Sequence, residues 1–234
     1  MGCYLDQSIG YRSYFQIESN VIPFIQFMRN LKEKSRSEFD WLSRYYDILF
    51  GTAFFRSFYR RLENEIGHLD GKNVLSIGSG TATLEIHLAE KFPDTNIVCL
   101  DLSSKMHEVA KKKSSHIKNI SFVEGDVESL SFHDQSFDLI ICSHSFHHYP
   151  DQRKALKEMR RVLKIDGSIF LIDAIKDHLQ DRTWVWFIEH ILEPGVKHYS
   201  SNELKNLFEE AGFNQVVIKR MNKLGVGYSL VIAG

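Results

Sequence analysis

The 234-residue sequence predicts an α/β fold, in which a seven-stranded, mostly parallel sheet has helices on both faces and ends in an antiparallel hairpin. Two observations predict this fold. From about residue 70 onward, short apolar runs alternate with segments of helical length, which is the pattern of a doubly wound sheet. After the last helix, two strand-like runs follow each other closely, as in a hairpin. We expect residues 1–65 to form an N-terminal helical cap and residues 66–234 to form the α/β domain.

Five apolar runs are predicted to be buried parallel strands. They are Asn73–Gly78, Ile97–Asp101, Ile120–Val123, Phe137–Cys142 and Ser168–Asp173. The segments between them that are long enough for helices are Thr83–Lys91, Ser104–Lys113 and Gln152–Leu163. Strand and helix therefore alternate through most of the chain.

The C-terminal part of the chain has a different pattern. Ser200 and Glu203 have the spacing of a capping box at the start of a helix, and Gly212 is predicted to end that helix. The runs Phe213–Lys219 and Gly227–Ile232 are then separated by only a few residues. We expect them to form an antiparallel hairpin that closes the sheet.

Two regions rich in aromatic residues lie outside this alternation. The first 65 residues hold about half of the aromatic residues, and helices are predicted at Ile22–Leu31 and Arg44–Arg61. The second region is an insert, Lys176–Tyr199, after the fifth strand. These aromatic side chains either pack on the sheet or line a lid over an active site. The insert residues that we expect to contact a substrate are Trp184, Trp186, Phe187, His190 and Tyr199.

Composition excludes several classes of function. The net charge is −1 and the pI is about 6.8, so there is no broad basic field to bind nucleic acid. The three cysteines are scattered, without the spacing of metal ligands or of a disulfide framework, which favours a reducing cytoplasm. No apolar stretch approaches the length of a membrane span, and no signal peptide is evident. We therefore expect a cytoplasmic protein without stable membrane insertion.

A glycine-rich turn follows the first predicted strand, at Gly78, Ser79 and Gly80. Such a turn is tight and lets a cofactor approach the backbone closely. Asp101 ends the second strand, where a carboxylate can accept the hydroxyls of a ribose. Asp126 follows the third strand, near the expected position of an adenine. The alternatives are a plain tight turn and, for each aspartate, a capping role.

Together with SFDLI at 136–140, HHYPD at 147–151 and LKEMRRVLKIDG at 156–167, these residues resemble the class I S-adenosylmethionine-dependent methyltransferases, which have a Rossmann-like fold. The resemblance extends from about Gly71 to the C-terminus. It implies that S-adenosyl-L-methionine is the cofactor. The residues that it implies for binding the cofactor are Tyr46, Gly78, Ser79, Gly80, Asp101, Leu102, Met106, Gly125, Asp126, Val127 and Ser143.

The resemblance has a looser N-terminal part and two departures. Residues 39–47 are similar to a helix of quinone-biosynthesis C-methyltransferases, and residues 46–51 are similar to phospholipid N-methyltransferases. Ser76 stands where the family usually has an acidic residue, and Ala82 stands where it has a third glycine. The missing carboxylate normally helps to hold the amino group of the cofactor.

Methyl transfer from a sulfonium is an in-line displacement, so the protein mainly aligns the donor with the acceptor and excludes water. The candidate bases are His144, our first choice, and then His148 and the adjacent His147, both of which could instead have only packing or capping roles. No metal site is predicted, because adjacent histidines do not readily point the same way.

The acceptor is expected to be a small or lipid-like molecule, methylated at O, N or C. The sequence leaves open the oligomeric state, a dimer included. One alternative is a non-catalytic binding module, which Ser76 supports. The other is a nicotinamide-dependent oxidoreductase. Thr83 argues against it, because the dinucleotide-binding fingerprint has Gly or Ala at this position.

Overall fold

The structure is a computed structural model that describes residues 30–34, 36–37, 39–41, 43, 47, 52–223 and 226–234, without the side chains of 52–56, 223 and 226. Most of the predicted helix Ile22–Leu31 lies outside the described residues, and so does Tyr46. Among the described residues, no helix is both long and apolar enough to cross a lipid bilayer.

The sheet has seven strands in the order β3-β2-β1-β4-β5-β7-β6. Neighbouring strands pair in parallel from β3 to β5, and β7 runs antiparallel to both β5 and β6. The strands are β1 (Asn73–Ile77), β2 (Asn96–Asp101), β3 (Ile120–Glu124), β4 (Phe137–Ser143), β5 (Leu163–Ala174), β6 (Val217–Lys223) and β7 (Val226–Ala233). The predicted parallel sheet and its closing hairpin are confirmed.

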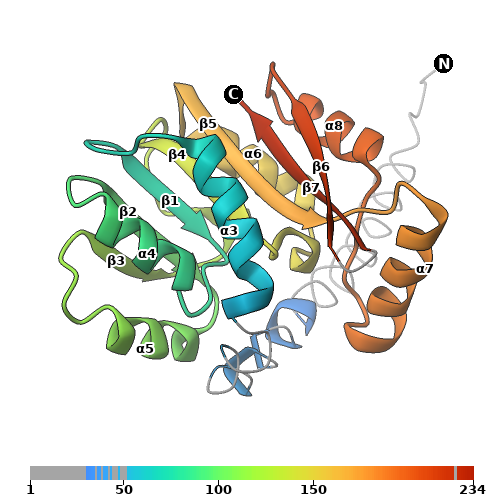
Figure 1. Cartoon of the computed structure of the whole chain (residues 1–234), viewed down its shortest axis with the longest axis horizontal. Helices are drawn as coiled ribbons and strands as arrows, with labels where there is room; N and C mark the ends of the chain where they lie inside the picture. Colours follow the sequence, from blue (N-terminus) through green and yellow to red (C-terminus); the bar gives the residue numbers. More distant parts are fainter. Residues whose placement is uncertain are drawn as a thin grey trace, which may run out of the picture.

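Helices cover both faces of the sheet, as predicted (Figure 1). Leu75 and Ile77 of β1 face one core cluster, which includes residues of α6 and α8, whereas Val74 faces a second cluster with α3 and α4. Side chains of a strand point alternately to its two faces, so one strand supplies both cores. The helices are α3 (Thr52–Ile66), α4 (Thr83–Lys91), α5 (Ser104–Lys113), α6 (Gln152–Val162), α7 (Leu179–Phe187) and α8 (Ser201–Glu210).

Several element boundaries differ from the predictions, most of them by one residue; larger differences occur in α3, β5 and β6. α3 extends beyond Arg61 to Ile66, where Gly67 takes a positive φ of 71°. β5 begins at Leu163, directly after α6, because Leu163 pairs with Phe137 ahead of a register shift in the β4–β5 ladder. β6 begins at Val217 rather than at Phe213, because Phe213 is buried in the core, with its ring 5.1 Å from that of Phe208.

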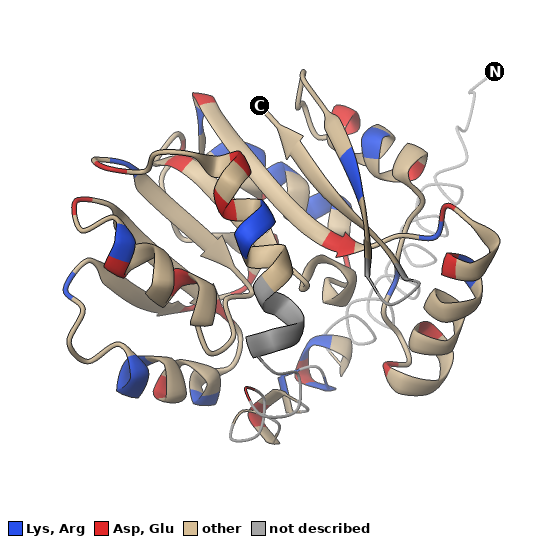
Figure 2. Ribbon diagram, viewed as in Figure 1, with Lys and Arg blue, Asp and Glu red and all other residues tan. Residues whose placement is uncertain are grey.

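Helix ends are stabilised as the sequence predicts. Both hydrogen bonds of the capping box between Ser200 and Glu203 are present at the start of α8. Ser103 caps α5 by accepting a hydrogen bond from the Met106 amide at 3.1 Å. The helices carry both acidic and basic residues, in agreement with the near-zero net charge (Figure 2).

Candidate cofactor site and active site

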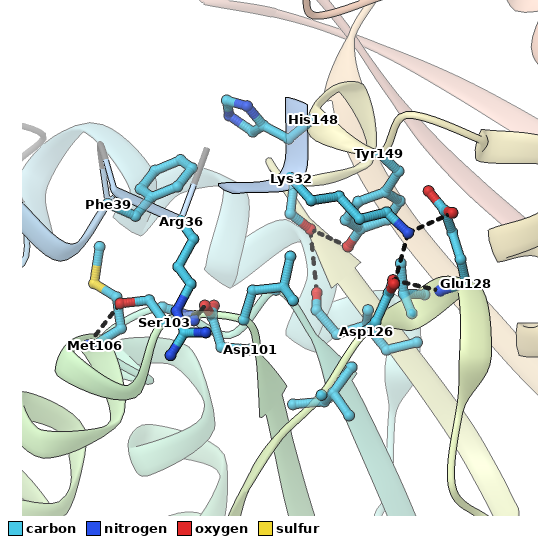
Figure 3. Close-up of a pocket in the computed structure, with 18 of the residues that line it drawn as sticks. Lys32, Arg36, Phe39, Asp101, Ser103, Met106, Asp126, Glu128, His148 and Tyr149 are labelled. Atoms are coloured by element: carbon cyan, nitrogen blue, oxygen red, sulfur yellow. Dashed lines mark hydrogen bonds and ion pairs between the residues drawn. The ribbon is translucent and has the colours of Figure 1, made fainter. Parts of the chain in front are cut away.

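A cavity lies at the carboxyl ends of β1, β2, β3 and β4 (Figure 3). Its empty volume is about 770 Å³, including the part that is open to solvent. In open α/β sheets, ligands bind at this edge, where the strand order reverses. The lining residues are Lys32, Arg36, Phe39, Ile77, Gly78, Gly80, Leu100, Asp101, Leu102, Ser103, Met106, Gly125, Asp126, Val127, Glu128, His144, Ser145, His148, Tyr149 and Pro150.

The glycine turn forms one wall of the cavity and is joined to β2. The amide of Gly78 donates to the Leu100 carbonyl at 2.8 Å, and the amide of Ser79 donates to the same carbonyl at 3.2 Å. Gly78 and Gly80 have φ angles of 66° and 53°, in the left-handed region that favours glycine. Both glycines line the cavity, whereas Ser79 does not.

Gly78 is also required by a close contact beneath the turn. A Cβ atom at Gly78 would lie 2.4 Å from Cβ of Ser145, which no real structure tolerates. Ser145 Oγ donates to the Ile77 carbonyl at 3.1 Å and shares a hydrogen bond of 2.9 Å with the Tyr149 hydroxyl. The turn and the segment after β4 therefore pack directly against each other and form the floor of the cavity.

Asp101 lies at the end of β2 and binds the glycine turn. Its Oδ2 accepts the Gly80 amide at 2.8 Å, and its Oδ1 accepts the Ser103 amide at 2.9 Å. Burial raises the pKa of the Asp101 carboxyl, against the effect of these backbone donors. Because Ser103 caps α5 with its own side chain, Asp101 is not needed as a cap, and its carboxylate faces the cavity. Leu102 and Met106 line the cavity beside it.

Asp126 has the capping role that the sequence left open. Its Oδ1 accepts the Glu128 amide at 2.9 Å, at the start of the 3-10 helix η1 (Val127–Ser129). Lys32 Nζ lies 2.6 Å from Asp126 Oδ2 and 2.6 Å from Glu128 Oε2 (Figure 3). Burial tends to lower the pKa of Lys32, but the hydrogen bonds to these two carboxylates raise it. Gly125 and Val127 also line the cavity.

Sequence reasoning missed the residues that cover the cavity from the N-terminal side. Lys32, Arg36 and Phe39 lie in the helical residues 30–34, 36–37 and 39–41 and are spaced four and three residues apart, on one helix face. Arg36 Nη2 donates to Glu124 Oε1 at 2.7 Å, and the Phe39 ring meets His148 edge-on at 4.9 Å. This spacing can be read from the sequence, but three residues at helical spacing do not indicate which part of the protein they contact.

Both proposed bases line the cavity, whereas His147 does not. His144 follows β4 with a φ of 54°, and its ring packs edge-on against Phe58 at 4.9 Å. Burial, together with the neighbouring His147, lowers the pKa of His148 to about 3. Burial also tends to lower the pKa of His147, but the charge of Asp173 and a hydrogen bond to it raise that pKa to about 10.

The five insert residues predicted to contact substrate are not among those that line the cavity. Trp184, Trp186 and Phe187 lie on α7 with 42%, 55% and 37% of their surface exposed. His190, in the π-helix η3 (Ile188–Leu192), stacks on Trp186 at 5.0 Å. Tyr199 donates to Gln152 Oε1 at 2.7 Å. Their contact with substrate stays a prediction, as does the role of Ser143, which is not a lining residue either.

The structure shows the surroundings of Ser76 and the backbone conformation of Ala82, the two residues that depart from the family pattern. Ser76 Oγ donates to Glu85 Oε1 at 2.6 Å, and both residues are buried. A carboxylate from α4 therefore lies beside the β1 position that lacks one, and burial raises its pKa. Ala82 has a φ of 55°, so it adopts the left-handed conformation that a glycine would take at lower cost.

Comparisons with known proteins identify the family of this chain. Residues 75–171 match the model of a family described as "Methyltransferase domain". The chain is 31% identical over 170 residues to demethylmenaquinone methyltransferase of Thermotoga maritima, covering 67% of this chain and 73% of the relative. It is 27% identical over 212 residues to the enzyme of the same name from Staphylococcus aureus, covering 80% and 88%.

Solved structures share the fold at lower identity. The YcgJ protein from Bacillus subtilis has a TM-score of 0.63 at 23% identity, covering 75% of this chain and 96% of that one. A SAM-dependent methyltransferase from Aquifex aeolicus has a TM-score of 0.59 at 19% identity, covering 75% and 88%.

The structure is an α/β fold with a cavity at the carboxyl edge of its sheet, where enzymes of such folds bind nucleoside cofactors. The chain belongs to the class I S-adenosylmethionine-dependent methyltransferases, and S-adenosyl-L-methionine is its methyl donor. The nicotinamide-dependent alternative is therefore set aside.

Proposed function

We propose that the protein methylates a carbon atom of a small, quinone-like ring in its reduced, hydroxylated form. The observation that carries this proposal is the similarity to demethylmenaquinone methyltransferase over 67% of the chain, combined with a cavity whose acceptor end is bounded by histidines and a tyrosine. The comparisons themselves support methyl transfer to a small molecule.

The lining residues divide the cavity into two ends. Asp101, Leu102 and Met106 form the end beside β2, where we place the adenosine of the cofactor. His144 and Tyr149 line the end beside β4, where the methyl group and the acceptor ring meet. An electron pair on a ring carbon attacks the methyl carbon, and the sulfur leaves with the electrons of the broken bond, which gives S-adenosylhomocysteine. His144 accepts the proton that the reduced ring releases.

A second, smaller hollow offers a route for the acceptor. It is lined by Leu31 and Lys34 from the N-terminal side and by Glu193 and Pro194 from the insert, and His148 lines both hollows. Lys34 Nζ donates to the Pro194 carbonyl at 3.2 Å, so the two regions meet there. We propose that the insert 176–199 and the described residues 30–34, 36–37 and 39–41 cover the acceptor; residues 1–29 of the expected cap lie outside the described residues.

The test is methylation by the purified protein of three acceptors, with isotopically labelled cofactor. The acceptors are a reduced demethylmenaquinone analogue with a short side chain, a simple phenol and vesicles that contain phosphatidylethanolamine. We expect labelled methyl only in the ring of the first acceptor. Label in the phenol oxygen or in the lipid amine would overturn the proposed acceptor and leave the enzyme class intact.

His144→Ala tests the proposed base in the same assay. We expect turnover to fall while the affinity for the cofactor, measured by calorimetry, stays unchanged, because His144 lies at the acceptor end. His133→Ala removes an exposed histidine and serves as the matched control. Equal turnover of the His144 variant and the control would exclude His144 as the base.

A further inference from the structure

A cluster of metal-binding side chains lies between the cofactor cavity and the smaller hollow. His147 and His148 come from the 3-10 helix η2 (Phe146–His148), and Glu193 directly follows η3. One ligand atom from each of the three residues lies within 4.8 Å of the other two. His147 Nε2 is 3.4 Å from Glu193 Oε2, and His148 Nε2 is 3.6 Å from the same oxygen.

These distances fit a tetrahedral metal ion. Zinc bonds to histidine nitrogen and to carboxylate oxygen are about 2.1 Å long, so tetrahedral ligand atoms lie about 3.4 Å apart. Three protein ligands with a fourth position open to water or substrate is the arrangement of catalytic zinc sites. Glu193 and His148 both line the smaller hollow, so a water or substrate molecule in that hollow could take the fourth position.

The electrostatics of the cluster also call for a cation. His147 Nδ1 lies 2.7 Å from Asp173 Oδ1, so that its Nδ1–H can donate to the carboxylate while Nε2 is left to bind a cation in place of a proton. Glu193 Oε2 is buried and lies 3.4 Å from His147 Nε2, without a well-formed hydrogen bond. A buried carboxylate oxygen in this position is costly, and a metal ion between the two atoms would satisfy it.

Asp173 supplies the second feature of a metal site. Ligating histidines usually donate their other ring nitrogen to a carboxylate, which fixes the orientation of the ring. Asp173 is itself fixed, because it accepts the His147 amide at 3.0 Å and the Ala174 amide at 2.8 Å. The neighbouring group of His147, Asp173 and His198 is thereby satisfied by hydrogen bonds, so we place no ion there.

We propose that His147, His148 and Glu193 bind a divalent transition-metal ion of the Zn²⁺ type, with Asp173 as the positioning residue for His147. The sequence predicts no metal, because adjacent histidines tend to diverge. In η2, however, the two rings lie 4.1 Å apart at an angle of 41°. The proposal does not depend on the identity of the methyl acceptor.

The test is titration of chelator-treated protein with Co²⁺ and then with Zn²⁺, without S-adenosylmethionine. We expect one equivalent of Co²⁺ to give the visible absorption of a tetrahedral site, and Zn²⁺ to abolish that absorption by displacement. Glu193→Gln should remove the absorption, and Asp173→Asn should weaken binding by about 10- to 100-fold. The matched controls His190→Ala and Glu189→Gln, nearby on η3, should bind Co²⁺ as the unchanged protein does.

Two results would overturn the proposal. The first is the absence of Co²⁺ absorption in the unchanged protein, which would mean that only a proton lies between His147 and Glu193. The second is Co²⁺ binding that Glu193→Gln leaves unaltered. Glu193 is 36% exposed at its side chain, so its replacement should not unfold the protein, and a thermal melt checks this. Calorimetry with S-adenosylmethionine on the same variants tells failure of the metal site from failure of the cofactor site.

Discussion

Replacing Asp101 by alanine tests the assignment of the cofactor site most directly. Each carboxylate oxygen of Asp101 accepts one backbone amide, from Gly80 or from Ser103, and retains a lone pair for a ribose hydroxyl. Hydrogen bonds to a charged group contribute about 1.5–3 kcal/mol each, and two bonds from one carboxylate are not additive. We therefore expect a loss of about 1.5–3 kcal/mol, which is roughly a 10- to 150-fold weaker cofactor affinity.

The assay is calorimetry with three ligands: S-adenosylmethionine, S-adenosylhomocysteine and adenosine. All three carry the same ribose, so Asp101→Ala should weaken all of them by the same factor. Glu124→Gln is the matched control, because Glu124 pairs with Asp101 across β2 and β3 and its loss changes the net charge equally. An Asp101 variant that binds adenosine as tightly as the control would refute a contact with the ribose.

Two further predictions concern the wall of the cavity and the helix behind it. Gly80→Ala should lower the free energy of unfolding by only about 1–2 kcal/mol, because of the left-handed backbone at this position, but it should weaken cofactor binding, because the added Cβ enters open space in the cavity. Gly78→Ala should lower the melting temperature more than Gly80→Ala does, because its Cβ would clash with Ser145. Equal melting temperatures of the two variants would contradict this. Burial raises the pKa of Glu85 in the folded state, so its favourable contribution to stability exists below the ordinary value of 4.5 and is lost as pH rises through the raised pKa. Glu85→Gln should therefore melt at a higher temperature than the unchanged protein at neutral pH, with the difference vanishing below about pH 4.5; a lower melting temperature at every pH would refute this.

Local patterns in the sequence were sufficient for most of the fold. The central strands β1 and β4 are buried on both faces and appear as continuous apolar runs, whereas the predicted strand at Ile120–Val123 is the edge strand β3 and is only partly buried; the capping box of α8 is a contact within four residues. The start of β5 at Leu163 was not predictable in this way, because it depends on a partner strand. The pairing of Leu163 with Phe137 converts the end of a helical pattern into a strand.

The same distinction between local patterns and long-range contacts holds for the residues of the candidate site. Residues that directly follow a strand, such as Gly78, Asp101 and His144, could be found because the carboxyl edge of a parallel sheet brings them together. Lys32 could not, because its contact with Asp126 spans 94 residues of sequence. Tyr149 was not predicted as a site residue, because the histidines that precede it are the more obvious candidates for a base. In the structure its hydroxyl lies beneath the glycine turn.

Ser76 shows why a departure from a family pattern is better judged in three dimensions than position by position. In the sequence, the position of Ser76 has lost a carboxylate, which supports a non-catalytic module. In the structure, the carboxylate of Glu85 reaches the same place from α4 and accepts the hydroxyl of Ser76 at 2.6 Å. A negative charge held close to the glycine turn attracts a cationic cofactor whichever element supplies it, since the Coulomb energy depends on distance and surroundings and not on chain position. The cost of the arrangement is a more deeply buried carboxyl, which explains why we expect Glu85→Gln to stabilise the fold and at the same time to weaken the binding of S-adenosylmethionine.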